Sequence, residues 1–263
     1  IVVTPSPATV PDLFSSLFNR RMLLCCLIGF ASGLPMYVLV QLVPAWLRTE
    51  GVDLKSIGLF SLTTIPYAAK FAWAPLLDKV TISRLGRRRG WALAVQVGLL
   101  LSLGSLAFLD AAESLRAIGV LCLVVAFFSA TQDVVLDAYR REILPDHELG
   151  LGNSLSVNAY RLSSLVPGSL GFILADLIPW SAVHVVVASF MLVGIATTVW
   201  MPEPATTAWG VPSLKEIVVA PFVEFFERMG VRGAIAVLVF MLLYKVGDTM
   251  ATALATPFYL DLG

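Results

Sequence analysis

The chain has 263 residues, of which 58% are hydrophobic and 14% are charged, and its formal net charge at pH 7 is zero. A soluble domain carries roughly a quarter charged residues, and several apolar runs here are long enough to cross a bilayer, so an ordinary soluble protein is excluded. We expect an all-α membrane protein with several spans. Because the sequence starts at Ile1 and has no signal peptide, we also expect it to be a portion of a longer protein.

Residues 1–21 are predicted to form an N-terminal tail that is rich in proline and threonine at its start and includes a short helix on the membrane surface. Residues 22–200 are predicted to form a bundle of six transmembrane helices, because each apolar run in this range is long enough to span. The six helices are expected at about 22–47, 56–77, 91–109, 115–139, 151–178 and 182–200.

A polar linker is predicted at 201–231, followed by a seventh transmembrane helix at 232–263. Within the linker, Ser213-Leu-Lys-Glu216 fits a capping box, and the apolar positions that follow are typical of an amphipathic surface helix. The N-terminal tail, the linker and the loops on their side carry most of the lysines and arginines. By the positive-inside rule, we expect this side, including the N-terminus, to face the cytoplasm.

The fourth predicted helix ends in a polar stretch. Ser129, Asp133, Asp137 and Arg140 share one helical face, because residues three and four apart are neighbours. Carboxylates inside a span are costly, so Asp133 and Asp137 are expected to face a protein interior or a wet cavity. Either they form a proton or substrate site, or they pair with basic neighbours and fix the packing.

Lys70 lies in the second predicted helix, roughly 12 Å from the end at Asp78 when each residue rises 1.5 Å. Asp133 lies at a similar depth relative to Arg141, so a Lys70–Asp133 ion pair is geometrically plausible. Such a pair would by itself give both residues a structural reason to be there.

Arg161 and Lys245 are predicted near the middle of the membrane, roughly 16 and 18 Å from the ends of their helices. A cationic cavity at that depth suits an anionic cargo. Alternatively, Arg161 pairs with Asp133 or Asp137 and only holds helices together. Lys245 has the same alternative with Asp248.

Three uncharged polar side chains, those of Tyr37, Gln41 and Asn158, are candidates for hydrogen bonds to a sugar. Polar residues in a helical bundle also often connect helices to one another. Both interpretations of these three residues stay open.

No catalytic or metal site is expected. Cys25, Cys26 and Cys122 lie inside apolar runs without metal-ligand spacing, and we expect small buried side chains there. No Gly-x-Ser-x-Gly or His-Glu-x-x-His pattern occurs, so we expect no enzyme, no metal and no cofactor. The expected partners are the lipid bilayer and a small anionic molecule, without nucleic acid, and we expect a monomer.

The first and seventh predicted helices look like repeats. The first contains Gly33 and later Pro44-Ala-Trp-Leu-Arg-Thr-Glu-Gly51, and the seventh contains Gly247 and later Pro257-Phe-Tyr-Leu-Asp-Leu-Gly263. Together with the long linker, this repeat suggests six helices followed by the first helix of a second bundle. That arrangement resembles the duplicated architecture of the major facilitator superfamily.

Stretches throughout the chain resemble the AmpG-type muropeptide permeases, a branch of that superfamily. They are Gly29–Pro35, Ile57–Leu62, Lys70–Asp78, Gly86–Trp91, Ser129–Ala138, Tyr160–Leu162 and Tyr244–Asp248. The resemblance implies that the chain is the N-terminal half of such a permease plus its seventh helix. It also implies proton-driven import of N-acetylglucosaminyl-anhydromuramyl peptides across the bacterial inner membrane, which in some bacteria feeds β-lactamase induction and β-lactam resistance.

In such a permease, protons are the coupling ion, and we expect Asp133, Asp137 or Asp248 to carry them. Arg161 and Lys245 would bind the anionic cargo.

The loop that contains Asp78, Arg87 and Arg88 resembles the superfamily's motif between helices two and three, which implies structural ion pairs or a gate. We expect Lys70 to serve the same structural purpose. A related carrier of another bulky anion, such as acetyl-coenzyme A, is the alternative function, because a cationic pocket suits both cargoes.

Overall fold

The structure is a computed structural model that describes residues 19–82, 85–111, 113–204, 223–241 and 243–244. The chain divides into two compact units, residues 1–207 and residues 208–263. All regular secondary structure in the described ranges is helical, which confirms the all-α prediction.

Four helical paths in the first unit are long and apolar enough to cross a membrane. They are α2 (Arg20–Tyr37) with the π-helix η1 (Val38–Leu42) and α3 (Val43–Thr49); α7 (Arg87–Ser105) with the 3-10 helix η4 (Leu106–Phe108); α8 (Leu115–Ile143); and α11 (Trp180–Ser189) with α12 (Met191–Trp200). These paths coincide with the first, third, fourth and sixth predicted helices, and they make the chain a multi-pass membrane protein.

The second and fifth predicted helices differ from expectation, because each is helical but broken into short pieces. The second consists of α4 (Leu54–Leu59), η2 (Phe60–Thr64), α5 (Ile65–Ala69), η3 (Lys70–Ala72) and α6 (Ala74–Lys79). The fifth consists of α9 (Leu149–Leu162), which follows the turn η5 (Asp146–Glu148), then η6 (Val166–Leu170) and α10 (Gly171–Ala175). Pro66, Pro75 and Pro167 lie within these paths, and a proline removes a backbone donor and displaces the preceding turn.

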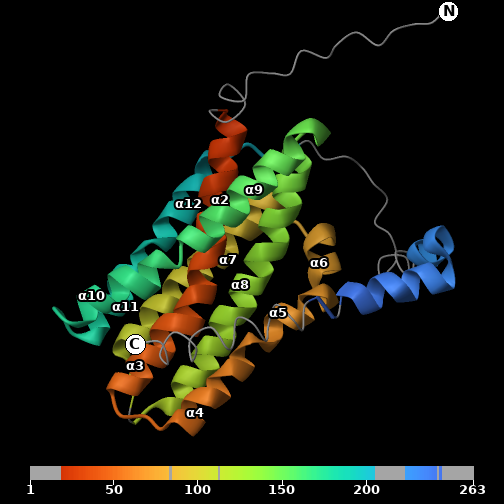
Figure 1. The fold of residues 1–263 in the computed structure, drawn as a ribbon. Helices are drawn as coiled ribbons and strands as arrows, with labels where there is room; N and C mark the ends of the chain where they lie inside the picture. Colours follow the sequence, from red (N-terminus) through yellow and green to blue (C-terminus); the bar gives the residue numbers. More distant parts are fainter. Residues whose placement is uncertain (1–18, 83–84, 112, 205–222, 242, 245–263) are drawn as a thin grey trace, which may run out of the picture. The chain divides into compact units, whose positions relative to one another are not determined.

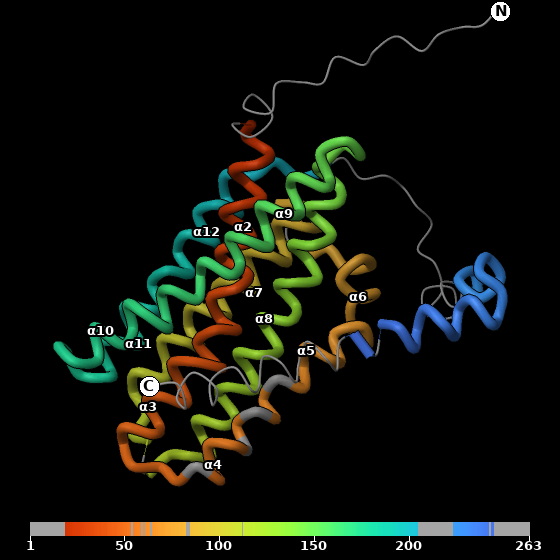
Figure 2. The backbone as a smooth tube through the Cα atoms, viewed as in Figure 1, coloured from red at the N-terminus to blue at the C-terminus, as the bar shows by residue number. Residues whose placement is uncertain are grey.

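Within the first unit, the helices lie side by side along one direction (Figures 1 and 2). Helix α2 packs against α8, α9 and α12, while α8 packs against α7 and along the broken path from η2 to α6. The first path contacts the fifth, and the fourth path contacts the second in the same way. Likewise, the sixth path contacts the first, and the third path contacts the fourth. The two broken paths, the second and the fifth, therefore have corresponding neighbours in this contact pattern.

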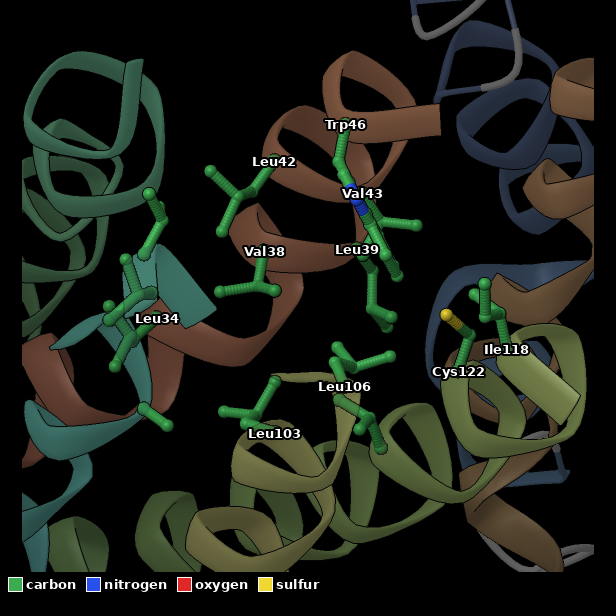
Figure 3. Close-up of a cluster of buried hydrophobic side chains, with 14 of the residues drawn as sticks. Leu34, Val38, Leu39, Leu42, Val43, Trp46, Leu103, Leu106, Ile118 and Cys122 are labelled. Carbon is green, nitrogen blue, oxygen red and sulfur yellow. The ribbon is translucent and has the colours of Figure 1, made fainter. Parts of the chain in front are cut away.

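The largest buried cluster joins the first path to α7 and α8. Figure 3 shows Leu34, Val38 and Leu42 on one side of this cluster and Leu103 with Leu106 on the other. Burying these side chains inside the bundle fixes the relative positions of the helices through close packing rather than through a hydrophobic drive out of water, because lipid is as apolar as they are.

Cys25 and Cys122 are buried and free, as predicted, while Cys26 is partly buried.

Helices α2 and α9 approach so closely that only glycine fits on the α2 side. A Cβ atom at Gly29 would collide with the backbone carbonyl of Ser156, and one at Gly33 would collide with that of Tyr160. The small residues of the first helix therefore permit close packing. It also brings the polar residues of α9 next to α2.

In the second unit, helix covers residues 223–241 and continues through the predicted boundary between linker and seventh helix at residue 231. Gly230, one residue before that boundary, has a left-handed φ of 67°. The capping box at 213–216 and most of the predicted seventh helix lie outside the described residues, so the domain boundaries in this part stay predictions.

Candidate functional site

A cavity of about 370 Å³ lies where α2, α8 and α9 meet. Each helix contributes four residues to its lining, spaced so that they share one helical face. They are Ile28, Gly29, Ser32 and Tyr37 from α2; Asp133, Leu136, Asp137 and Arg140 from α8; and Ser156, Val157, Tyr160 and Arg161 from α9. We call this cavity the central pocket.

Asp133 is the most enclosed charged group of the central pocket, with 13% of its side chain exposed. Its Oδ1 accepts a hydrogen bond of 2.5 Å from the Ser32 hydroxyl. Its Oδ2 lies 3.8 Å from Nζ of Lys70, whose side chain is 36% exposed. The predicted Lys70–Asp133 pair is therefore present, but it is long, and the serine makes the closer contact.

Asp137, one turn further along α8, is paired with a different cation. Arg140 donates to Asp137 Oδ1 through Nη2 and to the Ser156 hydroxyl through Nη1, both at 2.8 Å. The Arg140 side chain is 19% exposed and that of Asp137 is 56% exposed. The guanidinium thus connects α8 to α9 across the central pocket.

Arg161 lines the same pocket without an ion pair to either aspartate, as far as the described residues show. The described residues thus do not show the pairing of Arg161 with Asp133 or Asp137 that the structural alternative expects, and the role of Arg161 stays a prediction. The arginine is exposed and lines the same pocket as Tyr37 and Tyr160, whose ring centroids are 5.7 Å apart in an edge-on arrangement. An aromatic pair beside a free guanidinium offers both stacking and charge to a ligand.

Two predicted ligand residues lie outside the central pocket. The amide nitrogen of Asn158 donates to the Ser154 backbone carbonyl one turn back, at 2.8 Å. Gln41 belongs to η1 and packs so closely on Gly168 of η6 that a Cβ there would collide with its side-chain oxygen. The contact of Gln41 fits the alternative that this residue connects helices.

Asp78 and Arg88 belong to a separate cluster at the start of α7. Arg88 has only 7% of its side chain exposed and lies between Asp78, at 2.7 Å, and Glu142, at 2.5 Å. Arg87 also contacts Glu142, at 3.1 Å. Glu203 accepts hydrogen bonds from the backbone amides of Arg88 and Arg89, so it caps the first turn of α7. We call Asp78, Arg87, Arg88, Glu142 and Glu203 the charged end.

Four lining residues were missed by the sequence analysis as site residues: Ser32, Arg140, Ser156 and Tyr160. Serine and tyrosine are common in helical bundles, so type alone gave no signal. The spacing of these residues was the available signal, because Ser156 and Tyr160 are four residues apart and Ser32 follows Gly29 by three, which places each pair on one helical face. The predicted residues Lys245 and Asp248 lie outside the described residues.

The central pocket combines two carboxylates with two arginines and several hydroxyl groups. This set can exchange ion pairs with an anionic molecule and can hold a proton. Within the described part of the chain, no three His, Cys, Asp or Glu side chains are placed to hold a metal ion.

A family model described as acetyl-coenzyme A transporter 1 matches residues 21–162, just over half of the chain and all three helices of the central pocket. The chain belongs to this family. The match covers the first four helical paths and α9, the first helix of the fifth path.

Curated relatives extend the similarity beyond the match of the family model. An uncharacterized protein of Haemophilus influenzae is 46% identical over 255 residues, which cover 96% of this chain and 60% of that protein. The anhydromuropeptide permease of Escherichia coli K12 is 41% identical over 239 residues, covering 90% of this chain and 48% of the permease. A putative transporter AmpG 4 of Rickettsia felis is 27% identical over 255 residues, covering 93% and 61%. The resemblance to AmpG-type permeases is thereby confirmed, and the chain spans about half the length of the curated relatives it matches.

Proposed function

We propose that the chain is part of a transporter, not an enzyme, that imports anhydromuropeptides across the bacterial inner membrane. The main support for this proposal is the central pocket, which is lined by Arg140 and Arg161 together with two aspartates and a tyrosine pair. Two relatives that are 41% identical to this chain over 90% of its length are named anhydromuropeptide permease. The N-terminus and the charged end would face the cytoplasm, and the transporter would act as a monomer.

The side chains of the central pocket match the chemistry of this cargo. An anhydromuropeptide carries peptide carboxylates, which pair with guanidinium groups in bidentate fashion, and sugar hydroxyls, which bond to serine and tyrosine. Arg161 is the guanidinium with free donors, because no described acidic residue pairs with it. We assign the cargo's carboxylate to Arg161.

Proton coupling would use Asp133. A carboxylate in a span is costly unless it is paired, and its one cation, Lys70, is 3.8 Å away and partly exposed. The Ser32 hydroxyl can donate to the charged carboxylate and can accept from the protonated one, so it supports both states. Asp137 already has Arg140 at 2.8 Å, which makes it the weaker candidate for carrying a proton.

Acetyl-coenzyme A is the second candidate cargo, because the family model that matches this chain is described by that substrate. It too is a bulky anion, and its phosphates would bind the same arginines. The two cargoes differ in their sugar and peptide parts, which a direct competition distinguishes.

The test uses the complete natural polypeptide that contains this chain, reconstituted in vesicles with a pH gradient. We expect uptake of labelled anhydromuropeptide that excess unlabelled acetyl-coenzyme A does not reduce. Uptake of labelled acetyl-coenzyme A alone would replace the proposed cargo by the second candidate.

A second test addresses Arg161. Arg161→Ala and Arg161→Lys should both weaken cargo binding, because lysine lacks the planar fork of the guanidinium. Binding to both purified variants at parental affinity, across pH 5.5–8, would show that Arg161 does not hold the cargo. Asn158→Ala is the matched control on the same helix, since its amide bonds only to its own helix.

A further inference from the structure

A second hollow continues the central pocket along the groove between α8 and α9. Its volume is about 360 Å³, and it lies between the end of α8 and the start of α9. Its lining residues are Asp137, Arg140, Arg141, Leu149, Gly150 and Asn153. We call it the end pocket.

The central pocket and the end pocket share two lining residues, Asp137 and Arg140. Arg140 starts from α8 and reaches Ser156 of α9 with one nitrogen, while its other terminal nitrogen holds Asp137 of its own helix. The side chain therefore lies across the groove at the point where the two pockets adjoin. Apart from this side chain and Asp137, the two pockets have separate linings.

We propose that Arg140 is a crossbar that closes the groove between the two pockets and opens it when an anionic group of the cargo takes the place of Asp137. This inference rests on the proposed function for the nature of the anion, but not for the crossbar itself. It assigns Arg140 a role that the sequence analysis did not give it.

The exchange is balanced in charge. Arg140 loses a carboxylate partner and gains the carboxylate of the cargo, so the guanidinium is never left unpaired inside the bundle. Asp137 is more than half exposed and can be solvated once it is released. Ser156 is buried, and its hydroxyl loses one donor when the arginine turns away, which favours return to the closed form.

Rotation of this one side chain would join the central pocket to the end pocket and so to the end of the bundle near Leu149. No movement of a helix is needed, because α8 and α9 already form both walls of the groove. The groove would then be a route for the cargo or for water between the two pockets.

The test measures the accessibility of a cysteine placed behind the crossbar. Leu136→Cys is made in the complete polypeptide with Cys25, Cys26 and Cys122 replaced by alanine, because Leu136 is buried, lies one turn before Arg140 and lines the central pocket only. A membrane-impermeant thiol reagent is added on the side where α9 begins. Asn153→Cys, which lines only the end pocket, reports access to the outer part of the groove.

We expect Arg140→Ala to raise the labelling rate of Leu136→Cys by about tenfold or more, the change expected when one charge-assisted hydrogen bond no longer holds the closed form. The matched control is Arg141→Ala, because Arg141 lines the end pocket only and pairs with the exposed Asp146. It should leave labelling unchanged. Ser156→Ala and Asp137→Asn each remove one anchor of the crossbar and should raise the rate in part, which keeps the test decisive if Arg140→Ala folds poorly.

Equal labelling of Leu136→Cys in all of these variants and in the parent would overturn the crossbar. Added anhydromuropeptide should accelerate labelling in the parent and have no further effect in Arg140→Ala. If the variants behave as expected but the muropeptide has no effect while acetyl-coenzyme A does, the crossbar stands and the proposed cargo fails. If neither anion changes the parent's labelling, the displacement of Asp137 by cargo is wrong.

Discussion

Helix α8 takes part in two charge clusters that balance their charges in different ways. At the charged end, Arg88 has two carboxylates within 2.7 Å, and Glu142 accepts from two arginines. In the central pocket, Asp133 has one cation at 3.8 Å, and Arg161 pairs with no described acid. The charged side chains of the charged end pair closely with one another, while in the central pocket Asp133 has a distant cation and Arg161 has no described acidic partner.

This difference separates structural from functional charge within one helix. A buried charge that is fully paired resists exchange, because removing any partner leaves the others uncompensated. A charge with a distant partner can accept a ligand or a proton at low cost. We therefore expect variants of the charged end to lose stability and variants of the central pocket to lose transport.

The largest expected effect is that of Arg88→Ala, which should lower the free energy of unfolding by about 3 kcal/mol, the cost typical of removing one partner from a buried ion pair. The variant leaves Asp78 without its cation and leaves Glu142 with Arg87 alone. Denaturant unfolding of the purified protein in detergent measures the change.

The control for Arg88→Ala is Arg141→Ala, whose partner Asp146 is exposed, so the loss should stay below about 1 kcal/mol. Equal losses in the two variants would show that the charged end is no more structural than an ordinary surface pair.

The second effect concerns the wall of the central pocket. Gly29→Ala should cost about 2 kcal/mol through overpacking, because its new methyl group meets the backbone carbonyl of Ser156 and helices α2 and α9 must separate. The same unfolding measurement applies. Gly104→Ala is the matched control, since the space around Gly104 is open. A neutral Gly29→Ala would mean that the pocket wall yields easily, contrary to the close packing described above.

The third effect is small in stability and large in function. Asp133→Asn should change the free energy of unfolding by less than about 1 kcal/mol, because the lost pair with Lys70 is long and partly exposed. Asparagine keeps an acceptor for the Ser32 hydroxyl. Uphill accumulation of cargo driven by a pH gradient should nevertheless be lost, while exchange of cargo across the membrane remains.

Vesicle uptake with and without the pH gradient tests Asp133→Asn. Accumulation at the parental level would assign proton coupling to another residue. A loss of stability as large as that of Arg88→Ala would remove the contrast between the two clusters.

Much of the fold followed from the sequence, because four of the six predicted helices are continuous apolar runs whose length alone indicates a span. The breaks in the other two paths did not follow. Pro66 and Pro167 were visible, but a proline in a membrane helix can cause a mild kink as well as a break, and the neighbouring helices decide which occurs.

For the site, the Lys70–Asp133 pair was predictable because both residues lie at matching depths from the ends of their helical paths, although the path of Lys70 is broken. The bond from Arg140 to Ser156 was not predictable, because it depends on how closely α2 and α9 let α8 approach. Sequence spacing places residues on a face of one helix, whereas the partner across the interface follows only from packing.

The smallest effect lies outside both clusters, at the cap of α4. Asp53 accepts a hydrogen bond from the Ser56 backbone amide at 2.9 Å, and its side chain is exposed. The Ser56 side chain and backbone amide hold the pKa of the Asp53 carboxyl below its ordinary value. A lowered folded-state pKa gives stability that is present above the unfolded value of about 4 and is lost as pH falls through the folded value.

Asp53→Asn keeps a capping oxygen but removes this titration, and Asp53→Ala removes both. We expect the parent to be slightly more stable than Asp53→Asn at pH 7, and the difference to vanish as the pH falls below the folded pKa of Asp53. Melting temperatures of the two proteins between pH 7 and pH 3 measure this difference, since all other titrating groups are common to both. A difference that stays constant over this range would mean that the charge of Asp53 contributes nothing to the cap, and that α4, unlike the charged end of α7, is capped by a hydrogen bond alone.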